Sequence, residues 1–542
     1  AQEANVSTVP GHMDLIDDAK HAVTISNKIG YPVMIKASAG GGGKGMRIAW
    51  NDEEAIEGFA RSKSEAASSF GDDRIFIEKF VVEPRHIEIQ VLADQYGNCV
   101  YLAERECSIQ RRNQKVIEEA PSPFLDEKTR VAMGEQSCAL AQAVGYTSAG
   151  TVEFIVDKEK NFYFLEMNTR LQVEHPVTEL ITGVDLVEQM IRVANGEKLN
   201  VKQNSIKLNG WAMESRLNAE DPYRNFLPSI GRLTRYRPPA ERVTKECVIR
   251  NDTGVFEGGE ISMFYDPMIA KLCTWSTNRS EAISAMENAL DRFEIEGIGH
   301  NLPFLSAVMG HTRFKSGNIT TAFIDEEYPD GFEGVNPSDD ILEVLSVTAL
   351  IITRMKMQRI SARDSTFDNP VPREDNLVTR IARKNTNMTI SDVKDGYKIS
   401  FEKKSFEASI KYELGGTLAE LSINGNQHAV KVTPVIGGYL LRLRGVEQVV
   451  KVMNSRIAEL SDLMPDKLPA DTSKFLLCPM PGLMVSIMVS EGDIIEEGQS
   501  LAMVEAMKME NVLRAEKSGK VSKISVAEGD SLAVDEIIME FE

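Results

Sequence analysis

The chain has 542 residues, with 61 lysines and arginines against 81 aspartates and glutamates, so its formal charge is −20. A polyanion repels phosphate backbones, which argues against nucleic-acid binding, and a hydrophobic content of 42% excludes wholesale disorder. The six cysteines form no C-x-x-C pair, so we expect neither a disulfide framework nor a zinc site. The most apolar helical stretch, residues 344–353, is too short to span a membrane.

Helical and strand patterns alternate over the first 80 residues. Apolar spacing predicts helices over residues 14–29 and 51–69, and strands over residues 31–38, 46–50 and 74–80. A mixed α/β pattern continues to residue 325, with a strand at 86–92 and a helix at 127–143. The sequence therefore predicts a multidomain α/β fold in this part of the chain.

The pattern changes after residue 325. A helix over residues 340–360 carries apolar side chains on nearly every side, which predicts burial all round. From residue 387 the period is two and turn signals recur, as in an antiparallel meander or barrel, which we expect to wrap the helix. Residues 464–473 are polar, contain two prolines and read as a linker.

An internal repeat marks residues 475–542. GLMVSIMVSEGD at 482–493 aligns with GKVSKISVAEGD at 519–530, at an offset of 37 residues. Two similar halves predict a flattened β-barrel with quasi-twofold symmetry. This segment holds 13 acidic and 5 basic residues, and we expect acids such as Glu491 and Asp493 to assist its docking to cationic sites.

The glycine run GGGGKG occupies residues 40–45. A strand-like segment follows it instead of a helix, which disfavours a dinucleotide fingerprint, and Gly45 follows Lys44 where a P-loop needs serine or threonine. The remaining interpretations are a hairpin that closes over phosphates, helped by Lys44 and Lys36, and a flexible surface turn.

Residues 151–156 and 162–168 predict a hairpin in which Glu153 lies opposite Glu166. Like charges in that position repel, and a dication would reverse the effect. Asn168 offers a third oxygen, so the hairpin suits magnesium carrying nucleotide phosphates. The alternative is a solvated hairpin face.

Two further polar clusters flank the hairpin. Arg170, Gln172 and Glu174 alternate in TRLQVEHP and are expected to share one face, as in a reaction centre. SIQRRNQK at 108–115 carries three cations, which would hold phosphate or a small anion, form a solvated loop, or pair with the acidic hairpin.

Lys508 lies between methionines, between the two halves of the repeat, where it suits attachment of a swinging prosthetic group.

Particular motifs resemble known families. AMKM at 506–509, with CPMPG at 478–482, resembles a biotinyl carrier domain, whereas lipoyl domains usually lack both methionines. KASAGGGGKGM, PRHIEIQVL, ERECSIQRRNQKVIEEAP and EMNTRLQVEHPVTE resemble the biotin carboxylase family within the ATP-grasp fold. The middle region is similar to the domain by which propionyl-CoA carboxylase α subunits hold their β partner, and YPDGFEG at 328–334 favours these over methylcrotonyl relatives.

The resemblance covers essentially the whole chain and implies a domain order. Residues 1–80 would form an ATP-grasp lid with the glycine-rich loop, and 81–325 the remainder of the ATP-grasp fold with the biotin carboxylase C-terminal domain. Residues 326–463 would form the partner-binding helix-in-barrel domain, 464–474 a linker, and 475–542 an all-β carrier barrel.

The resemblance also implies roles for individual residues. Glu174 would be the general base that deprotonates bicarbonate, Arg216 would stabilise the enolate of biotin beside Phe226, and Lys508 would carry biotin. Glu153, Glu166 and Asn168 would hold magnesium or manganese, and bicarbonate would bind Lys115, Arg170, Gln172 and Val173. The residues implied for ATP are Lys36, Gly42, Gly43, Glu78, Lys79, Val81, His86, Gln110 and Asn113.

The implied reaction phosphorylates bicarbonate with ATP, carboxylates biotin, and carries the carboxyl group to a carboxyltransferase β subunit that makes methylmalonyl-CoA from propionyl-CoA. The family further implies biotinylation by a biotin protein ligase, an α6β6 assembly, and a location in the bacterial cytoplasm or the mitochondrial matrix.

Other interpretations stay open. In one, the β subunit acts on acetyl-CoA or 3-methylcrotonyl-CoA. In a second, the chain is a different ATP-grasp ligase with a lipoyl-type carrier. In a third, it is a non-catalytic carrier and scaffold. Biotin carboxylases have a further domain before the point where this chain starts, with another ATP-contacting lysine. We therefore expect the chain alone to bind ATP poorly and carboxylate biotin weakly.

Overall fold

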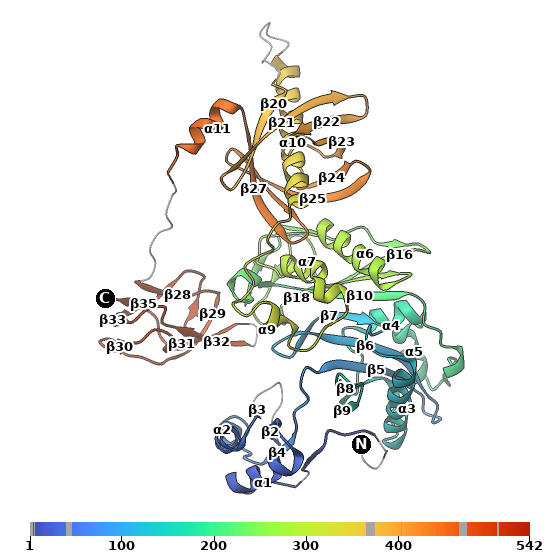
Figure 1. Cartoon of the computed structure of the whole chain (residues 1–542). Coiled ribbons are helices and arrows are strands. Elements are labelled where there is room, and N and C mark those ends of the chain that lie inside the picture. The colour runs from blue at the N-terminus through green and yellow to red at the C-terminus, as the bar shows by residue number, and fades with distance from the viewer. Residues whose placement is uncertain are drawn as a thin grey trace.

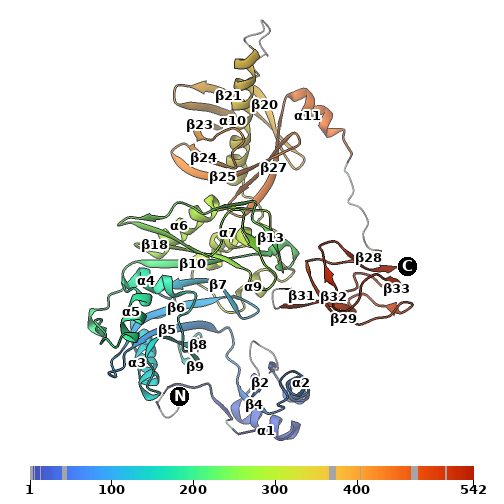
Figure 2. The same cartoon turned by 180° about the vertical axis from the view of Figure 1, so that it is seen from behind.

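A computed structural model of the chain describes residues 4, 6–12, 14–38, 46–364, 374–402, 404–465, 474–506 and 509–542. Figures 1 and 2 show a large α/β body, a barrel around a long helix, and a small all-β body beside them. The three architectures confirm the predicted fold class. All six cysteines are free thiols, and no helix in the described ranges is long and apolar enough to cross a membrane.

The N-terminal unit is an antiparallel sheet in the order β1-β4-β2-β3, packed against two helices. The helix predicted from residue 14 begins at Ala19, because the Asp18 carboxylate accepts a hydrogen bond from the backbone N–H of His21 and caps the helix there. Gly42 and Gly43 lie outside the described residues. The elements are β1 (Gly11–His12), α1 (Ala19–Ile29), β2 (Val33–Ala37), β3 (Met46–Ala49), α2 (Asp52–Phe70) and β4 (Ile75–Lys79).

A nine-stranded antiparallel sheet forms the centre of the large body, in the order β15-β16-β18-β10-β7-β6-β5-β8-β9. Its interior strands are buried on both faces because helices cover them. The predicted helix at 127–143 is α3. The strands are β5 (Arg85–Ala93), β6 (Cys99–Arg111), β7 (Gln114–Ala120), β8 (Ser148–Val156), β9 (Phe162–Asn168), β10 (Trp211–Asn218), β15 (Arg242–Val243), β16 (Cys247–Thr253) and β18 (Met268–Ser276), and the covering helices are α3 (Glu127–Ala143), α4 (His175–Thr182), α5 (Leu186–Ala194) and α6 (Arg279–Arg292).

Short elements complete this body around one apolar core, in which Phe226, Phe304 and Phe314 are buried. The strands are β11 (Glu220–Asp221), β12 (Leu227–Pro228), β13 (Gly231–Arg232), β14 (Arg235–Arg237), β17 (Glu260–Ile261) and β19 (Glu294–Glu296), and the helical elements are η2 (Gln203–Ser205), η3 (Pro222–Arg224), α7 (Leu302–Gly310), α8 (Thr312–Lys315) and α9 (Phe323–Glu327).

The helix α10 (Asp339–Asp364) lies inside a closed barrel of eight antiparallel strands (Figure 1). Residues 344–352 are all buried, and their apolar side chains share one core with the barrel strands, as the sequence predicted. The barrel begins before residue 387, because the alternating segment at Asn376 already pairs as a strand. The other elements are β20 (Asn376–Ile381), β21 (Lys384–Val393), β22 (Gly396–Phe401), β23 (Lys404–Lys411), β24 (Leu418–Ile423), β25 (Asn426–Val435), β26 (Gly438–Leu443), β27 (Val446–Met453) and α11 (Ser455–Asp462).

Two four-stranded sheets form the C-terminal body, in the orders β28-β35-β33-β30 and β32-β31-β29-β34. The predicted repeat is visible in the hydrogen bonds: Gly492 N–H donates to the Val521 carbonyl, and Gly529 N–H donates to the Met484 carbonyl, both at 2.8 Å. Lys508 lies outside the described residues. The strands are β28 (Phe475–Leu477), β29 (Gly482–Ile487), β30 (Ile494–Ile495), β31 (Ser500–Ala506), β32 (Met509–Arg514), β33 (Gly519–Ile524), β34 (Ser531–Leu532) and β35 (Ile537–Phe541).

Candidate active site

Lys115 on β7 is the hub of a charged network on the nine-stranded sheet. Its ammonium nitrogen lies 2.5 Å from Glu88, 3.0 Å from Glu153 and 2.6 Å from Glu174. Burial alone would lower the pKa of Lys115, but the surrounding carboxylates outweigh it and raise the pKa above its usual range. Lys115 therefore stays charged and holds three acidic side chains from three different segments together.

The strands bring these charges together by their register. Glu166, Glu153, Glu88 and Arg105 are successive cross-strand partners on β9, β8, β5 and β6. Residues directly opposite in antiparallel strands point to the same face, so three carboxylates form a row that ends at a cation.

Arg105 is fully buried, and its guanidinium donates five hydrogen bonds to side-chain oxygens. Its Nε donates to Glu88 at 2.5 Å, and its two terminal nitrogens donate to the side chains of Gln90, Thr178, Thr151 and Gln172 at 2.7–3.1 Å. Burial would raise the pKa of Glu88, but the charges of Arg105 and Lys115 lower it to about 2. A buried guanidinium with all its donors used fixes the geometry of the row.

The predicted hairpin β8–β9 has the expected register, with Glu153 directly opposite Glu166. The side-chain amide of Asn168 donates to a carboxylate oxygen of Glu153 at 3.0 Å and of Glu166 at 3.1 Å. Glu153 is buried, whereas Glu166 is exposed. The three proposed metal ligands therefore lie together, at the edge of the sheet where solvent reaches them.

The prediction that Arg170, Gln172 and Glu174 alternate and share one face is wrong. The strand ends at Asn168, and α4 begins at His175 with Pro176 in its first turn, so Glu174 is the residue at its N-terminal cap. Gln172 and Glu174 are buried and turn towards the network, where Gln172 donates to Glu153 at 2.7 Å. Arg170 is exposed, and its guanidinium lies 3.4 Å from the side-chain amide oxygen Oδ1 of Asn168.

Glu174 connects the Lys115 hub to Arg216 on β10. One carboxylate oxygen of Glu174 accepts a hydrogen bond from Lys115, and the other accepts one from Arg216 at 2.9 Å. Glu118 on β7 also binds Arg216, whose Nε donates to it at 2.6 Å. Both oxygens of the candidate base are therefore occupied by cations.

A second carboxylate pair lies behind Arg216. Glu118 and Glu214 are cross-strand partners on β7 and β10, and both are fully buried. Each has one oxygen without a hydrogen-bond partner in the described structure, and the other oxygen of Glu214 accepts a weak bond from the Cys273 thiol at 3.3 Å. Burial raises the pKa of Glu118 to about 7 and that of Glu214 to about 8, although Arg216 opposes the shift.

The residues implied for ATP come from both sheets. Lys36 forms an ion pair with Glu78 on the small sheet, and Lys79 donates to the Gly30 and Tyr31 carbonyls at 2.8 Å. On the large sheet, the ring of His86 lies 3.1 Å from Glu153. The other described residues of this set lie apart from these contacts. Val81 follows β4, Gln110 donates to the Cys107 carbonyl, and Asn113 occupies the β6–β7 turn.

Phe226 lies on a loop where Asn225 and Phe226 both have positive φ angles, of 53° and 57°. The guanidinium of Arg111 covers its ring at 4.4 Å, and Phe304 packs edge-on at 4.9 Å. The Val173 carbonyl, for its part, accepts a hydrogen bond from Lys271 at 2.6 Å.

Sequence reasoning missed four residues of the network: Glu88, Arg105, Glu118 and Glu214. The available signal was charged residues at inward positions of otherwise apolar strands, such as Glu88 within HIEIQVL. Buried charges need partners, so such positions predict a network but do not identify which charges meet.

Comparison with known families matches the chain in four successive segments. Residues 1–202 match the carbamoyl-phosphate synthase L chain ATP-binding domain, and residues 214–326 match the biotin carboxylase C-terminal domain. Residues 345–467 match the propionyl-coenzyme A carboxylase BT domain, and residues 475–541 match the biotin-requiring enzyme family.

Two relatives match along the whole of this chain, and a solved structure matches part of it. A propionyl-CoA carboxylase alpha chain from Ruegeria pomeroyi is 63% identical over 100% of this chain and 82% of the relative. The mitochondrial propionyl-CoA carboxylase alpha chain of Mus musculus is 47% identical over 100% of this chain and 75% of the relative. The biotin carboxylase domain of Hydrogenobacter thermophilus 2-oxoglutarate carboxylase, solved with MgADP, ADP and bicarbonate, is 45% identical with a TM-score of 0.56, over 60% of this chain and 71% of that one.

Proposed function

The chain belongs to the family of propionyl-CoA carboxylase α chains, and we propose that the network of Lys115, Glu174 and Arg216 is the centre at which it carboxylates biotin. The chain is an ATP-dependent ligase with biotin carboxylase and biotin-requiring regions. It serves the carboxylation of propionyl-CoA and works with a carboxyltransferase β partner. The observation that carries the proposed site is the buried Glu174 carboxylate, which contacts one cation with each oxygen.

Bicarbonate binds beside this carboxylate. Lys115, Arg170, Gln172 and Val173 form its site, and a bicarbonate that replaces the contact between Lys115 and Glu174 meets a cation and a proton acceptor together. Glu174 then takes the proton of bicarbonate. The anion that remains is stabilised by Lys115, whose charge is maintained by Glu88 and Glu153.

Magnesium, or manganese in its place, is held by Glu153, Glu166 and Asn168. The donor set fits a hard cation, because the two carboxylates lie directly opposite each other across the hairpin. The amide of Asn168 donates to both carboxylates, and turning it over would present its oxygen instead. The metal, when bound, neutralises charge on the phosphates of ATP.

ATP lies between the two sheets in this proposal, held by Lys36, Glu78, Lys79 and Val81 from the small sheet, and by His86, Gln110 and Asn113 from the large one. Gly42 and Gly43, outside the described residues, cover its phosphates. Biotin, attached to Lys508, supplies the ring nitrogen that receives the carboxyl group. Arg216 offers its guanidinium to the biotin carbonyl, held in place by Glu118, and Phe226 lines the pocket.

The wider assignments follow the relatives. The lid at residues 1–80, the carboxylase body at 81–325, the partner-binding domain at 326–463, the linker at 464–474 and the carrier at 475–542 would assemble with β subunits as α6β6, after a biotin protein ligase has modified the carrier. Relatives from a bacterium and from mitochondria suggest the bacterial cytoplasm or the mitochondrial matrix as its compartment.

Fixation of labelled bicarbonate by the chain together with its β partner tests the proposal, with propionyl-, acetyl- and 3-methylcrotonyl-CoA compared. We expect propionyl-CoA to be preferred and Glu174→Gln to abolish fixation while an avidin blot still detects biotin. Full fixation by Glu174→Gln would refute the assigned centre. Loss of the avidin signal in Lys508→Ala, with fixation lost, tests the attachment site separately.

A further inference from the structure

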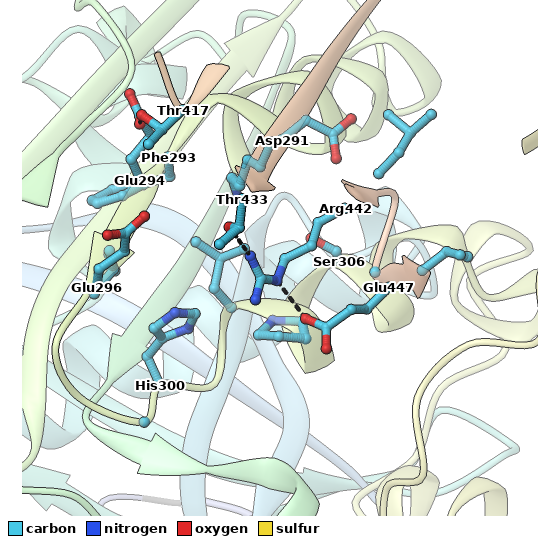
Figure 3. A pocket seen from close by; sticks show the side chains of 18 of the residues that line it. Asp291, Phe293, Glu294, Glu296, His300, Ser306, Thr417, Thr433, Arg442 and Glu447 are labelled. Atoms are coloured by element: carbon cyan, nitrogen blue, oxygen red, sulfur yellow. Dashed lines mark hydrogen bonds and ion pairs between the residues drawn. The ribbon is translucent and has the colours of Figure 1, made fainter. Parts of the chain in front are cut away.

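A cavity of about 450 Å³ lies at the junction of the carboxylase body and the barrel, outside the charged network (Figure 3). Its walls come from β19, α7 and the end of α6 on one side and from β25, β26 and β27 on the other. The junction is held by direct bonds: the backbone N–H of Arg444 donates to Asp291 at 2.9 Å, and Lys431 donates to the Leu290 carbonyl at 2.9 Å. Hydrogen bonds therefore join the two sides of the cavity.

Two cations line the barrel side of this cavity. Lys431 on β25 and Arg442 on β26 are direct cross-strand partners, a position in which like charges repel. Arg442 has Glu447 as an ion-pair partner and donates to Thr433 at 3.1 Å, as Figure 3 shows. Lys431 has no ion pair within the described residues, and its one hydrogen-bond acceptor there is the Leu290 carbonyl.

Four acidic residues of the cavity wall, Asp291, Glu294, Glu296 and Glu447, have cationic partners, whereas the carboxylate of Asp221 accepts a hydrogen bond from the backbone N–H of Tyr223 at 3.0 Å. Asp291 receives the Arg444 backbone bond and lies 3.3 Å from its guanidinium. Glu294 and Glu296 lie 3.5 and 3.8 Å from Arg235. Arg442 pairs with Glu447, so Lys431 is left as a lining cation without a carboxylate at ion-pair distance among the described residues.

Burial lowers the pKa of Lys431 to about 8, an effect that Asp291 and Glu294 oppose. An ammonium withdrawn from water without a carboxylate in contact is costly, and an anion in the cavity would reduce that cost.

Apolar side chains and one histidine of the cavity lining indicate which further groups a ligand would carry. Phe293, Ile295, Leu302 and Leu443 supply apolar surface. His300, which faces the cavity in Figure 3, has an Nδ1 atom without a hydrogen-bond partner among the described residues. Burial and the neighbouring cations Lys431 and Arg442 lower the pKa of His300 to about 4, so the ring is neutral near pH 7 and can donate one hydrogen bond.

We propose that this cavity binds a small organic anion, with its charged group between Lys431 and Arg442 and its apolar part against Phe293 and Leu302. The site is separate from the carboxylation centre and bridges the carboxylase body and the barrel. A carboxylate with a short alkyl chain matches both the charge and the apolar lining.

The test is calorimetric titration of the full chain with hexanoate, with acetate and inorganic phosphate as comparison probes. We expect saturable hexanoate binding that weakens by about tenfold or more in Lys431→Met, and no change in the control Lys411→Met, whose side chain is 89% exposed on β23. Equal hexanoate binding by the chain and by Lys431→Met, or no hexanoate binding, would overturn the proposal. Phosphate or acetate binding as tightly as hexanoate would overturn the assignment of the apolar part.

A measurement on the unaltered chain covers the case in which Lys431→Met misfolds. Acetic anhydride modifies neutral lysine amines, and mass spectrometry of the Lys431 peptide measures the rate. Hexanoate is expected to slow modification of Lys431 by about tenfold, while modification of Lys411 stays unchanged. Equal rates with and without saturating hexanoate would contradict binding at this site.

Discussion

The ammonium nitrogen of Lys115 lies 2.6 Å from a carboxylate oxygen of Glu174. Lys115 comes from β7 in the sheet, and Glu174 from the cap of α4, so this contact joins the sheet to the loop that follows the metal-site hairpin. In our proposal it is also the contact that bicarbonate replaces. The position of Glu174 therefore depends on two cations, and its chemistry can be tested apart from its fold.

Glu174→Gln keeps the shape of the side chain and removes its capacity to accept a proton. We expect bicarbonate-dependent ATP cleavage with biotin to fall by about 10²- to 10⁴-fold, the usual contribution of a general base. The matched control is Glu159→Gln, in the exposed β8–β9 turn, which should retain the parent rate. Parent-like cleavage by Glu174→Gln would assign the proton transfer to another group.

Arg105→Met tests the buried guanidinium. It leaves Glu88 without one of its two cations and leaves four polar side chains without a donor, so we expect the free energy of unfolding to fall by about 3–5 kcal/mol. Denaturant unfolding of the full chain measures it. Arg61→Met is the control, because its ion pair with Glu57 is exposed and worth about 0–1 kcal/mol. Equal losses in the two variants would show that Arg105 is not a structural centre.

Local patterns predicted the elements well, and pairing between distant strands was harder to predict. Glu153 and Glu166 could be matched because a short hairpin fixes their register. Glu88 and Arg105 could not, because their contacts with Lys115 and Gln172 depend on the strand order of the whole sheet. The error about a shared face for Arg170, Gln172 and Glu174 had a local cause: the polar alternation continues past Asn168, but β9 ends there and α4 begins at His175.

The carboxylate pair behind Arg216 predicts a dependence of stability on pH. The pKa values of Glu118 and Glu214 rise from 4.5 to about 7 and about 8, mainly by burial, so the folded chain binds more protons than the unfolded chain between these limits. Stability contributed by their protonated forms is complete below pH 4.5 and is lost as the pH rises to about 8. The slope is up to about 1.4 kcal/mol per pH unit for each proton.

Glu214→Gln keeps a neutral side chain beside Glu118 at every pH. We expect its unfolding midpoint to fall less steeply than that of the parent chain between pH 6 and pH 8.5, in thermal scans over about six pH values. The other charges that face the pair, Arg216, Glu174, Lys115 and Lys271, are unchanged in this variant. Parallel curves for the parent and Glu214→Gln would mean that Glu214 does not titrate in this range.

The repeat in the C-terminal body makes a prediction about two equivalent aspartates. A carboxylate oxygen of Asp493 accepts a hydrogen bond from the Ser490 N–H at 2.8 Å, and Asp530 accepts one from the Ala527 N–H at 2.8 Å. We expect Asp493→Asn and Asp530→Asn to lower the local stability of this body equally, by about 0.5–1.5 kcal/mol each. Hydrogen exchange of the amides in residues 475–542 of the full chain measures the loss.

The same two variants separate a structural role from a role in docking. If Asp493 serves mainly this turn, the two substitutions reduce exchange protection alike and leave carboxylation at the parent rate while the body stays folded. If the acidic surface steers docking instead, Asp493→Asn slows carboxylation more at low salt than at high salt, because screening weakens such steering.

Glu491, whose carboxylate accepts the Ile524 N–H at 2.9 Å, has its counterpart in Glu528, which accepts the Ile487 N–H at 3.1 Å. The pair Glu491→Gln and Glu528→Gln therefore repeats the experiment at a second turn, and unequal loss of protection within either pair would contradict the twofold equivalence of the halves.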